Sequence, residues 1–287
     1  MYIILGATGH VGSAVAEALL SKGEPVTIIT RDAGKSEKWK QKGAAVAVAD
    51  VHDVEALRRI FSTGKRLFLL NPPASPDKDT IAEEKKSLAS IIAAVAGSDF
   101  EKIVAESTYG AHDGDGVGDL GVLYEMEQKL AETRIPHSVI RGAYYMSNWD
   151  WFLKTAKEEG KIYSLYPADF KIPMVAPEDL GQFAAQLLTE PIERTGLYYV
   201  EGPEIYAPAD VANAFSEALG RPVETVVIPR TEWISYLTKS GFSQKAAEAM
   251  AAMTDVTLDQ KFEVSDSPIR GNVTLRAYIA GLVKAQV

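Results

Sequence analysis

The first twelve residues, MYIILGATGHVG (residues 1–12), decide the fold of this chain. Residues 1–5 form an apolar run of the kind found in β-strands, and residues 13–20 repeat apolar side chains at helical spacing. The stretch therefore predicts a strand, a turn with three glycines and a helix N-terminus. Such a helix end binds phosphate because free N–H groups and the positive end of the helix dipole point at the anion. A dinucleotide site is predicted here.

Each glycine of this turn has its own predicted role. Gly6 can adopt a backbone conformation that is barred to other residues, Gly9 lets the backbone approach a pyrophosphate, and Gly12 lets the helix pack closely on the strand. A glycine triplet that only shapes a βα turn is the alternative. The strand before the turn and the helix after it are the context that a dinucleotide motif requires, and they favour the binding site.

The composition is that of an ordinary globular protein. The chain has 287 residues, of which 46% are hydrophobic and 24% charged, which fits one large α/β domain or one domain with an appendage. No apolar run approaches the length of a membrane span, and no basic and apolar leader precedes the first strand. We therefore expect a cytoplasmic protein with no membrane partner.

Charge and residue counts exclude several other classes of protein. The chain has no cysteine, which excludes disulfides, thiolate metal sites and cysteine nucleophiles. Its net charge of −9 argues against a nucleic-acid partner. The four histidines, at positions 10, 52, 112 and 137, lack metal-ligand spacing, so no metal site is expected. The expected partner is a small-molecule substrate, bound by a monomer or a homodimer.

Apolar runs alternate with helical patterns through the first half of the chain. This alternation is typical of βαβ units and predicts an α/β fold with a doubly wound parallel (Rossmann) sheet. After the first strand, further strands are expected at residues 26–30, 45–48, 66–70, 102–107, 137–141 and 196–200. Helices are expected at residues 80–96, 148–157, 177–188, 207–219 and 231–252, and a loop at residues 110–119.

The pattern becomes mainly helical and less regular in the second half of the chain. In a doubly wound fold the substrate lies outside the carboxyl ends of the strands, where later segments of chain can cover it. We therefore expect residues 1–145 to form the NAD(P)-binding Rossmann core. Residues 146–287 are expected to form mainly a smaller, largely helical C-terminal lobe over the substrate, with segments near residues 172–200 returning to the core.

The spacing Gly-x-x-Gly-x-x-Gly, with Ala-Thr-Gly-His-Val at residues 7–11, resembles the atypical and extended short-chain dehydrogenase/reductase group. More closely it resembles the NmrA-like family, of the quinone oxidoreductase and triphenylmethane reductase type. Residues 127–148 resemble the family's E-x-x-L…SGI-P-x-T-x-L-R-x-G-x-F-x-E-N stretch, and residues 172–181 resemble the segment that returns from its substrate lobe. Residues 198–208 resemble its closing strand, so the resemblance covers most of the chain.

The residue after the second strand of such folds contacts the adenosine ribose and selects between NAD and NADP. An acidic residue there binds the 2′-hydroxyl of NAD, and an arginine favours the 2′-phosphate of NADP. By the resemblance, Arg31 occupies the position of the family's arginine that binds the 2′-phosphate, although the acidic Asp32 follows it. We therefore expect NADP(H) to be preferred over NAD(H), with a surface arginine of no role as the alternative. By the resemblance Asp50 and Val51 flank the adenine, and Asp53 caps the next helix.

The residues expected to contact the cofactor lie in the glycine loop and near the ends of strands. They are Gly6, Thr8, Gly9, His10, Val11, Arg31, Asp50, Val51, Asn71, Pro72, Ser107 and Tyr144. The substrate is expected against the aromatic rings of Tyr145, Trp149 and Phe152. The alternative is that these rings form the core of the lobe.

Short-chain dehydrogenases use a Tyr-x-x-x-Lys pair, in which the lysine lowers the pKa of the tyrosine so that it exchanges a proton near neutral pH. Tyr124 is followed here by Gln128 in the place of the lysine, and the family's lysine position falls on Leu123. The tyrosine position falls on Asp119, so the ordinary pair is expected to be absent. The remaining candidates for a proton donor, each of which is alternatively a packed tyrosine, are Tyr109, Tyr124 and Tyr144.

Two classes of function remain. The first, suggested by some reductases of the family, is an NADPH-dependent reductase that transfers hydride to a quinone-like or otherwise conjugated small molecule. Placing the acceptor against the nicotinamide supplies most of the advantage in such a reaction. The second is a non-catalytic NADP(H)-binding regulator that senses redox state. A nucleotide-sugar epimerase is disfavoured because it needs the tyrosine–lysine pair, and we predict the reductase.

Overall fold

The opening apolar run forms β1 (Tyr2–Ile4), which lies inside an eight-stranded sheet of the computed structural model. The structure describes residues 1–259 and 262–285. The other strands of this sheet are β2 (Val26–Thr30), β3 (Ala45–Val48), β4 (Arg66–Leu69), β5 (Lys102–Thr108), β6 (His137–Gly142), β10 (Gly196–Glu201) and β13 (Ile269–Arg270). All neighbouring strands in it run parallel.

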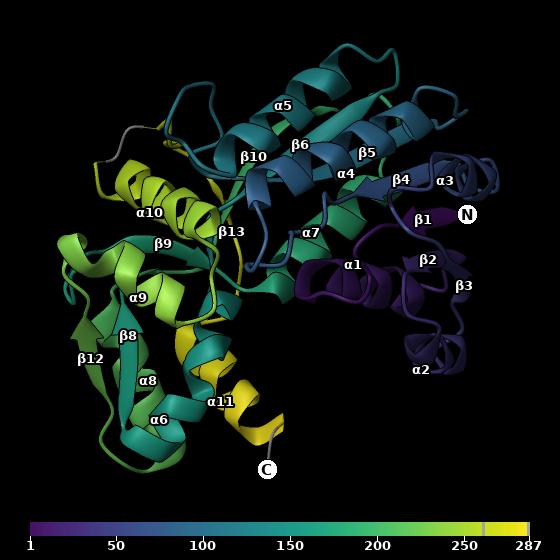
Figure 1. The fold of residues 1–287 in the computed structure, drawn as a ribbon. Helices are drawn as coiled ribbons and strands as arrows, with labels where there is room; N and C mark the ends of the chain where they lie inside the picture. Colours follow the sequence, from purple (N-terminus) through teal and green to yellow (C-terminus); the bar gives the residue numbers. More distant parts are fainter. Residues whose placement is uncertain (260–261, 286–287) are drawn as a thin grey trace.

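The strands lie in the order β13-β10-β6-β5-β4-β1-β2-β3. From β1 the chain adds β2 and β3 on one side and then crosses back to add β4, β5 and β6 on the other (Figure 1). This reversal between β1 and β4 is the switch point of a doubly wound sheet, beside which ligands bind at the carboxyl ends of the strands. The predicted fold class is therefore confirmed, and the six strands expected after the first are all present.

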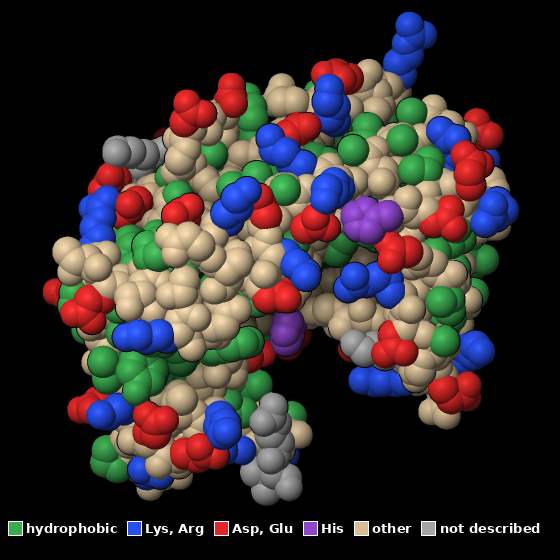
Figure 2. All heavy atoms as spheres, in the orientation of Figure 1, with side chains coloured by type: hydrophobic (Ala, Val, Ile, Leu, Met, Phe, Trp, Pro, Cys, Tyr) green, Lys and Arg blue, Asp and Glu red, His purple; other side chains and the backbone are tan. Residues whose placement is uncertain are grey.

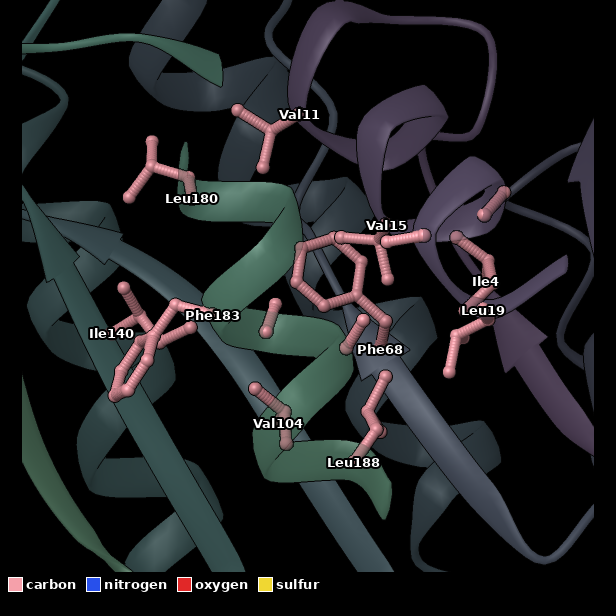
Figure 3. Packing of buried hydrophobic residues seen from close by; sticks show 14 of the residues in the cluster. Ile4, Val11, Val15, Leu19, Phe68, Val104, Ile140, Leu180, Phe183 and Leu188 are labelled. Atoms are coloured by element: carbon pink, nitrogen blue, oxygen red, sulfur yellow. The ribbon is translucent and has the colours of Figure 1, made fainter. Parts of the chain in front are cut away.

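Helices cover both faces of this sheet (Figure 1). α1 (His10–Ser21) and α7 (Pro177–Thr189) pack against each other on one face, while α3 (Val54–Phe61), α4 (Thr80–Val95) and α5 (Leu120–Ala131) cover the other. Figure 3 shows Val15 of α1 beside Phe68 of β4 on one side of α7, and Phe183 of α7 beside Ile140 of β6 on the other, within one buried cluster. Burying such side chains contributes about 1.5–3 kcal/mol each. The cluster therefore fixes α1, and with it the glycine loop, against the sheet.

Two helices begin where an aspartate caps them. The Asp53 carboxylate accepts a hydrogen bond from the Ala56 amide, which confirms the predicted cap of α3. The Asp79 carboxylate accepts one from the Ala82 amide at the start of α4. Each carboxylate satisfies an amide that the first turn of a helix leaves without a partner.

Most of the second half of the chain forms a smaller part of the molecule, at the lower left of Figure 1. Its helices are the 3-10 helix η2 (Met146–Phe152), α6 (Leu153–Glu159), α8 (Pro208–Leu219), α9 (Trp233–Lys239) and α11 (Leu275–Ala285). A parallel pair, β8 (Lys161–Ser164) and β12 (Glu224–Val227), lies among them. Trp149 and Phe215 are the largest fully buried side chains of its separate hydrophobic core.

Further elements join this part to the sheet. A three-stranded sheet has the order β11 (Ile205–Tyr206), β9 (Ile172–Val175) and β7 (Tyr144–Tyr145), and α10 (Gln244–Leu258) contacts α4. Short helices lie at η1 (Ala33–Lys35), α2 (Ser36–Gln41) and η3 (Arg230–Glu232). Across the described residues, no helix combines the length and apolar character needed to cross a membrane. The expected boundary between residues 145 and 146 stays a prediction.

Two predicted helices differ from the structure. The helix expected at residues 148–157 is a 3-10 helix up to Phe152 and an α-helix only from Leu153. The helix expected at residues 231–252 is wrong in its extent, because α9 and α10 are separate. Gly241, with φ at +98°, turns the chain between them in a conformation that favours glycine. Ser243 then caps α10 by accepting a hydrogen bond from the Ala246 amide.

Candidate functional site

The glycine loop leads directly into the N-terminus of α1. Gly6 adopts the left-handed conformation, with φ at +71°, and its carbonyl accepts a hydrogen bond from the Gly9 amide. The first amide to bond back into the helix is that of Ser13, which donates to the Gly9 carbonyl. No side chain caps this helix. The preceding amides of the first turn are therefore available to an anion.

Gly9 and Gly12 differ in how much space the surrounding protein leaves for a Cβ atom. A Cβ atom added at Gly12 would lie 2.3 Å from the Gly6 carbonyl oxygen, so packing of the helix on the loop requires a glycine there. A Cβ atom at Gly9 would meet only the same oxygen, at an ordinary 3.5 Å. Protein packing thus leaves open space at Gly9, beside the exposed Thr8. This arrangement fits a pyrophosphate bound against the loop.

Arg31 follows β2 at the carboxyl edge of the sheet and is exposed. Among the described residues, no hydrogen bond or ion pair engages its guanidinium. The neighbouring Asp32 carboxylate accepts a hydrogen bond of 2.8 Å from the Gly34 amide and caps η1. Asp32 therefore has a local structural role, and Arg31 is free to meet a phosphate.

The other residues predicted to contact a cofactor differ in their accessibility. Asp50 is exposed, and its carboxylate accepts a hydrogen bond from the His52 amide. Asn71 is 6% exposed at the end of β4, where its Nδ2 donates to the Glu84 carbonyl and its Oδ1 has no partner among the described residues. Ser107 is buried, and its hydroxyl donates to Glu127 on α5. The structure places Val11 and Val51 in the hydrophobic core and Pro72 in the half-buried segment after β4.

An aromatic pocket of about 470 Å³ opens beside the start of α1. Its walls come from η2, β8, α9 and α10, together with His10 of the glycine loop. Figure 2 shows a deep indentation at the lower edge of the molecule, between the part that contains α6, α9 and α11 and the part that contains α1 and α2. The rings that line the pocket include Tyr144, Trp149, Phe152, Tyr163, Tyr166 and Tyr236.

The structure brings together only some of the aromatic residues predicted for the site. Trp149, Phe152 and Tyr144 line the pocket. Tyr145 does not line it, and its hydroxyl donates to Glu106. Tyr109 is likewise outside the pocket, where its hydroxyl donates to Glu201 and its ring packs edge-on against Tyr199. The structure places Tyr124 on α5, also outside the pocket lining.

The tyrosines of the pocket are weak acids. Burial raises the pKa of Tyr144 far above its ordinary value, with a further contribution from Tyr166. Burial also raises the pKa values of Tyr166 and Tyr236. A raised pKa makes a phenol a poorer proton donor near neutral pH. Tyr144, the one predicted proton donor that lines the pocket, is therefore poorly suited to that role.

Three polar residues meet at the edge of the pocket in a cluster that the sequence did not predict. The Asp150 carboxylate on η2 lies 3.7 Å from the His10 imidazole, and the Tyr278 hydroxyl on α11 shares its one proton between the two Asp150 oxygens, at 3.0 and 3.1 Å. Desolvation raises the pKa of Asp150, while the Tyr278 hydroxyl and His10 act to lower it. The three residues are far apart in the chain, so only the fold reveals the group.

Glu106, the partner of Tyr145, is a buried carboxyl. It lies on β5 and is 3% exposed; its Oε1 accepts the Tyr145 hydrogen bond at 2.9 Å, and its Oε2 has no partner among the described residues. Burial raises the pKa of Glu106 to about 8, although the bond from Tyr145 acts to lower it. The carboxyl is therefore largely protonated in the folded protein at neutral pH.

We expect Glu106→Gln to weaken the pH dependence of stability. The unfolded chain releases this proton near pH 4.5 and the folded protein near 8, so the free energy of unfolding falls as the pH rises between these values. Each pH unit in the window costs at most about 1.4 kcal/mol, and a glutamine removes this contribution. Urea unfolding at several pH values between 5 and 8 measures the slope. Glu125→Gln, at a partly exposed site on α5, is the control, and an unchanged slope in Glu106→Gln would contradict the prediction.

Comparison with known proteins agrees with this geometry. The model of the NmrA-like family matches residues 2–275. The NAD(P)H azoreductase of Xenophilus azovorans is 25% identical over 250 residues, which cover 87% of this chain and 85% of that protein. The triphenylmethane reductase of Citrobacter sp., solved with NADP(H), superposes with a TM-score of 0.80 at 21% identity and full coverage of both chains. The NADPH complex of a quinone oxidoreductase from Escherichia coli gives 0.78 at 22% identity, covering 98% of this chain and 99% of that one.

Proposed function

The chain belongs to the NmrA-like family, and on this basis we propose that it is an NADPH-dependent reductase of a quinone-like or otherwise conjugated small molecule. The proposal assigns residues 1–145 mainly to the cofactor and residues 146–287 mainly to a lobe that covers the acceptor. The proposed reaction does not use a Tyr-x-x-x-Lys pair. The names of the azoreductase, the triphenylmethane reductase and the quinone oxidoreductase support it, since all three describe reductases of conjugated molecules.

NADPH, when bound, supplies the hydride. The first-turn amides of α1 and the space at Gly9 are suited to its pyrophosphate, and Arg31 to its 2′-phosphate. Asp50 and Val51 follow β3 on the side of the switch point where the adenine is expected. Two of the similar structures were solved with NADP(H) or NADPH, which supports the same choice of cofactor.

The aromatic pocket is the observation that carries the proposal. Its volume of about 470 Å³ is that of a small-molecule site. Aromatic walls stack well on flat, conjugated rings, and no lysine or arginine is among the described residues that line it. His10 lines this pocket and is also the first residue of α1, so the pocket adjoins the loop that we propose for the cofactor.

NADPH oxidation over a panel of quinones, azo dyes, cationic triphenylmethane dyes and enones tests the proposal. We expect turnover with at least one of these classes. The alternative is an NADP(H)-binding regulator without catalytic activity. Tight cofactor binding with no turnover on any acceptor would favour that regulator and overturn the reductase.

Arg31→Ala tests the choice of cofactor. The 2′-phosphate of NADPH can form charge-assisted hydrogen bonds with the guanidinium, and at this exposed site we expect them to contribute about 1.5–3 kcal/mol in total. We therefore expect the wild type to prefer NADPH, and the variant to bind NADPH roughly 10- to 100-fold more weakly while NADH binding changes much less. Fluorescence titration of both cofactors into both proteins measures the affinities.

Arg134→Ala is a matched control for this experiment. Arg134 is exposed and precedes the amino end of β6, on the edge of the sheet opposite the carboxyl ends. We expect this variant to bind both cofactors as the wild type does. Equal losses of NADPH and NADH affinity in Arg31→Ala would show that Arg31 does not contact the 2′-phosphate.

A further inference from the structure

The proposed reaction leaves one requirement that NADPH does not meet. Hydride transfer to a quinone or an azo group carries two electrons and one hydrogen nucleus, and it leaves negative charge on an oxygen or nitrogen of the acceptor. A proton has to reach that atom for the product to leave as a neutral molecule. A positioned acid that supplies such a proton typically contributes about 10²- to 10⁴-fold to the rate.

Few side chains of the pocket can supply this proton. Its described lining contains four tyrosines, Asp150 and His10 as titratable groups. Burial raises the pKa values of all four tyrosines, so each is a poor donor near neutral pH. Asp150 is engaged by the Tyr278 hydroxyl at both of its oxygens. The last candidate, His10, is a histidine, the side chain that most often serves as a general acid near neutral pH.

The position of His10 suits proton transfer. It is the first residue of α1, at the loop where the pyrophosphate is expected, and it also lines the aromatic pocket. Its side chain is 60% exposed, so it is accessible to an acceptor and to water. His10 therefore lies where cofactor and acceptor have to meet.

Asp150 is placed to orient the imidazole. Its Oδ2 lies 3.7 Å from the His10 Nε2, within the distance of an ion pair. The Tyr278 hydroxyl fixes the carboxylate from α11. Glu178, on α7, adds a further negative charge near Asp150 and Tyr278. The titratable groups around Asp150 thus come from the start of α1, from α7 and from α11.

We propose that His10 is the acid of this reaction and that Asp150 and Tyr278 are positioning residues for it. The inference rests on the proposed reductase function. NADPH, when bound, would supply the acceptor with a hydride, which is a hydrogen nucleus together with the two electrons of a C–H bond. The N–H bond of the His10 imidazolium breaks, and the proton goes to the acceptor oxygen or nitrogen. Neutral His10 then regains its proton from a hydronium ion or a buffer acid of the solvent, to which its exposed side chain is open.

The choice of acceptor separates this role from a structural one. A quinone needs both a hydride and a proton, whereas a cationic triphenylmethane dye becomes a neutral product by hydride transfer alone. We expect His10→Gln to lower kcat for a quinone by about 10²-fold or more. The loss for the cationic dye is expected to be at least ten times smaller. A loss of the same size for both acceptors would overturn the assignment.

One further measurement does not depend on turnover. We expect His10→Gln, which retains the backbone amide, to bind NADPH within about 3-fold of the wild type by fluorescence titration. The choice of acceptor also tests the positioning role of Asp150. In Asp150→Asn we expect kcat for the quinone to fall by a larger factor than kcat for the cationic dye. An equal loss for both acceptors would remove Asp150 from the positioning role.

The pH dependence of quinone reduction completes the test. The wild-type kcat is expected to fall at high pH as the acid loses its proton, and this fall is expected to vanish in His10→Gln. A wild type with no turnover on any acceptor would refute the reductase function itself. An active wild type whose rate and pH profile are retained in His10→Gln would refute the role of His10 alone.

Discussion

Gly9→Val is expected to abolish NADPH binding and to leave the fold intact. A Cβ atom at this position meets only the Gly6 carbonyl oxygen at 3.5 Å, so the protein itself has room for a side chain. The backbone of Gly9 is extended, with φ at −97°, which valine also adopts readily. The two added methyl groups would occupy the space in which the pyrophosphate has to approach the amides of α1. Fluorescence titration with NADPH and a thermal melt followed by circular dichroism measure the two expectations.

Gly12→Val is the matched control from the same motif, with the opposite expectation. Its Cβ atom would lie 2.3 Å from the Gly6 carbonyl oxygen and 2.8 Å from the Ala7 amide nitrogen. The backbone cannot relieve this overlap unless α1 moves, so we expect a large loss in the free energy of unfolding. Near-normal NADPH affinity in a folded Gly9→Val protein would show that the cofactor site lies elsewhere.

The glycine motif and the sheet could be predicted because their signals are local. A buried strand of a parallel sheet is a short apolar run, and each such run in the first half of the chain became a strand of the predicted type. Asp53 could be predicted as a cap for the same reason, since its carboxylate bonds to an amide three residues away. Where the physical cause lies within one element or one turn, the sequence alone is informative.

The pocket could be predicted only in part because its walls come from distant segments. Trp149 and Phe152 were candidates since aromatic residues cluster there in the sequence, but nothing local distinguishes Tyr144, which lines the pocket, from Tyr145, which does not. Successive side chains of a strand point to opposite faces, and on its own face the Tyr145 hydroxyl donates to Glu106 of β5. The short β8 and β12 strands were missed for a similar reason, since their pairing joins residues far apart in the chain.

The second large effect is expected for Glu127, which joins α5 to the sheet. Its carboxylate accepts hydrogen bonds of 2.9 and 2.7 Å from the Arg141 guanidinium and another from the Ser107 hydroxyl. The side chains of Glu127 and Arg141 are only 9% and 8% exposed. Burial acts to lower the pKa of Arg141, but the Glu127 carboxylate outweighs it and raises that pKa. The two charges thus depend on each other in a nearly dry environment.

We expect Glu127→Ala to lower the free energy of unfolding by about 3–5 kcal/mol, the usual cost of leaving one charge of a buried pair uncompensated. Urea unfolding near neutral pH measures it. Glu127→Leu combined with Arg141→Met removes both charges and is the control, because a buried ion pair replaced by apolar side chains of similar size often costs little. The double variant should therefore be more stable than Glu127→Ala. A double variant that is less stable would mean that Glu127 acts through its packing and its bond to Ser107, and that neutralising Arg141 is not its main contribution.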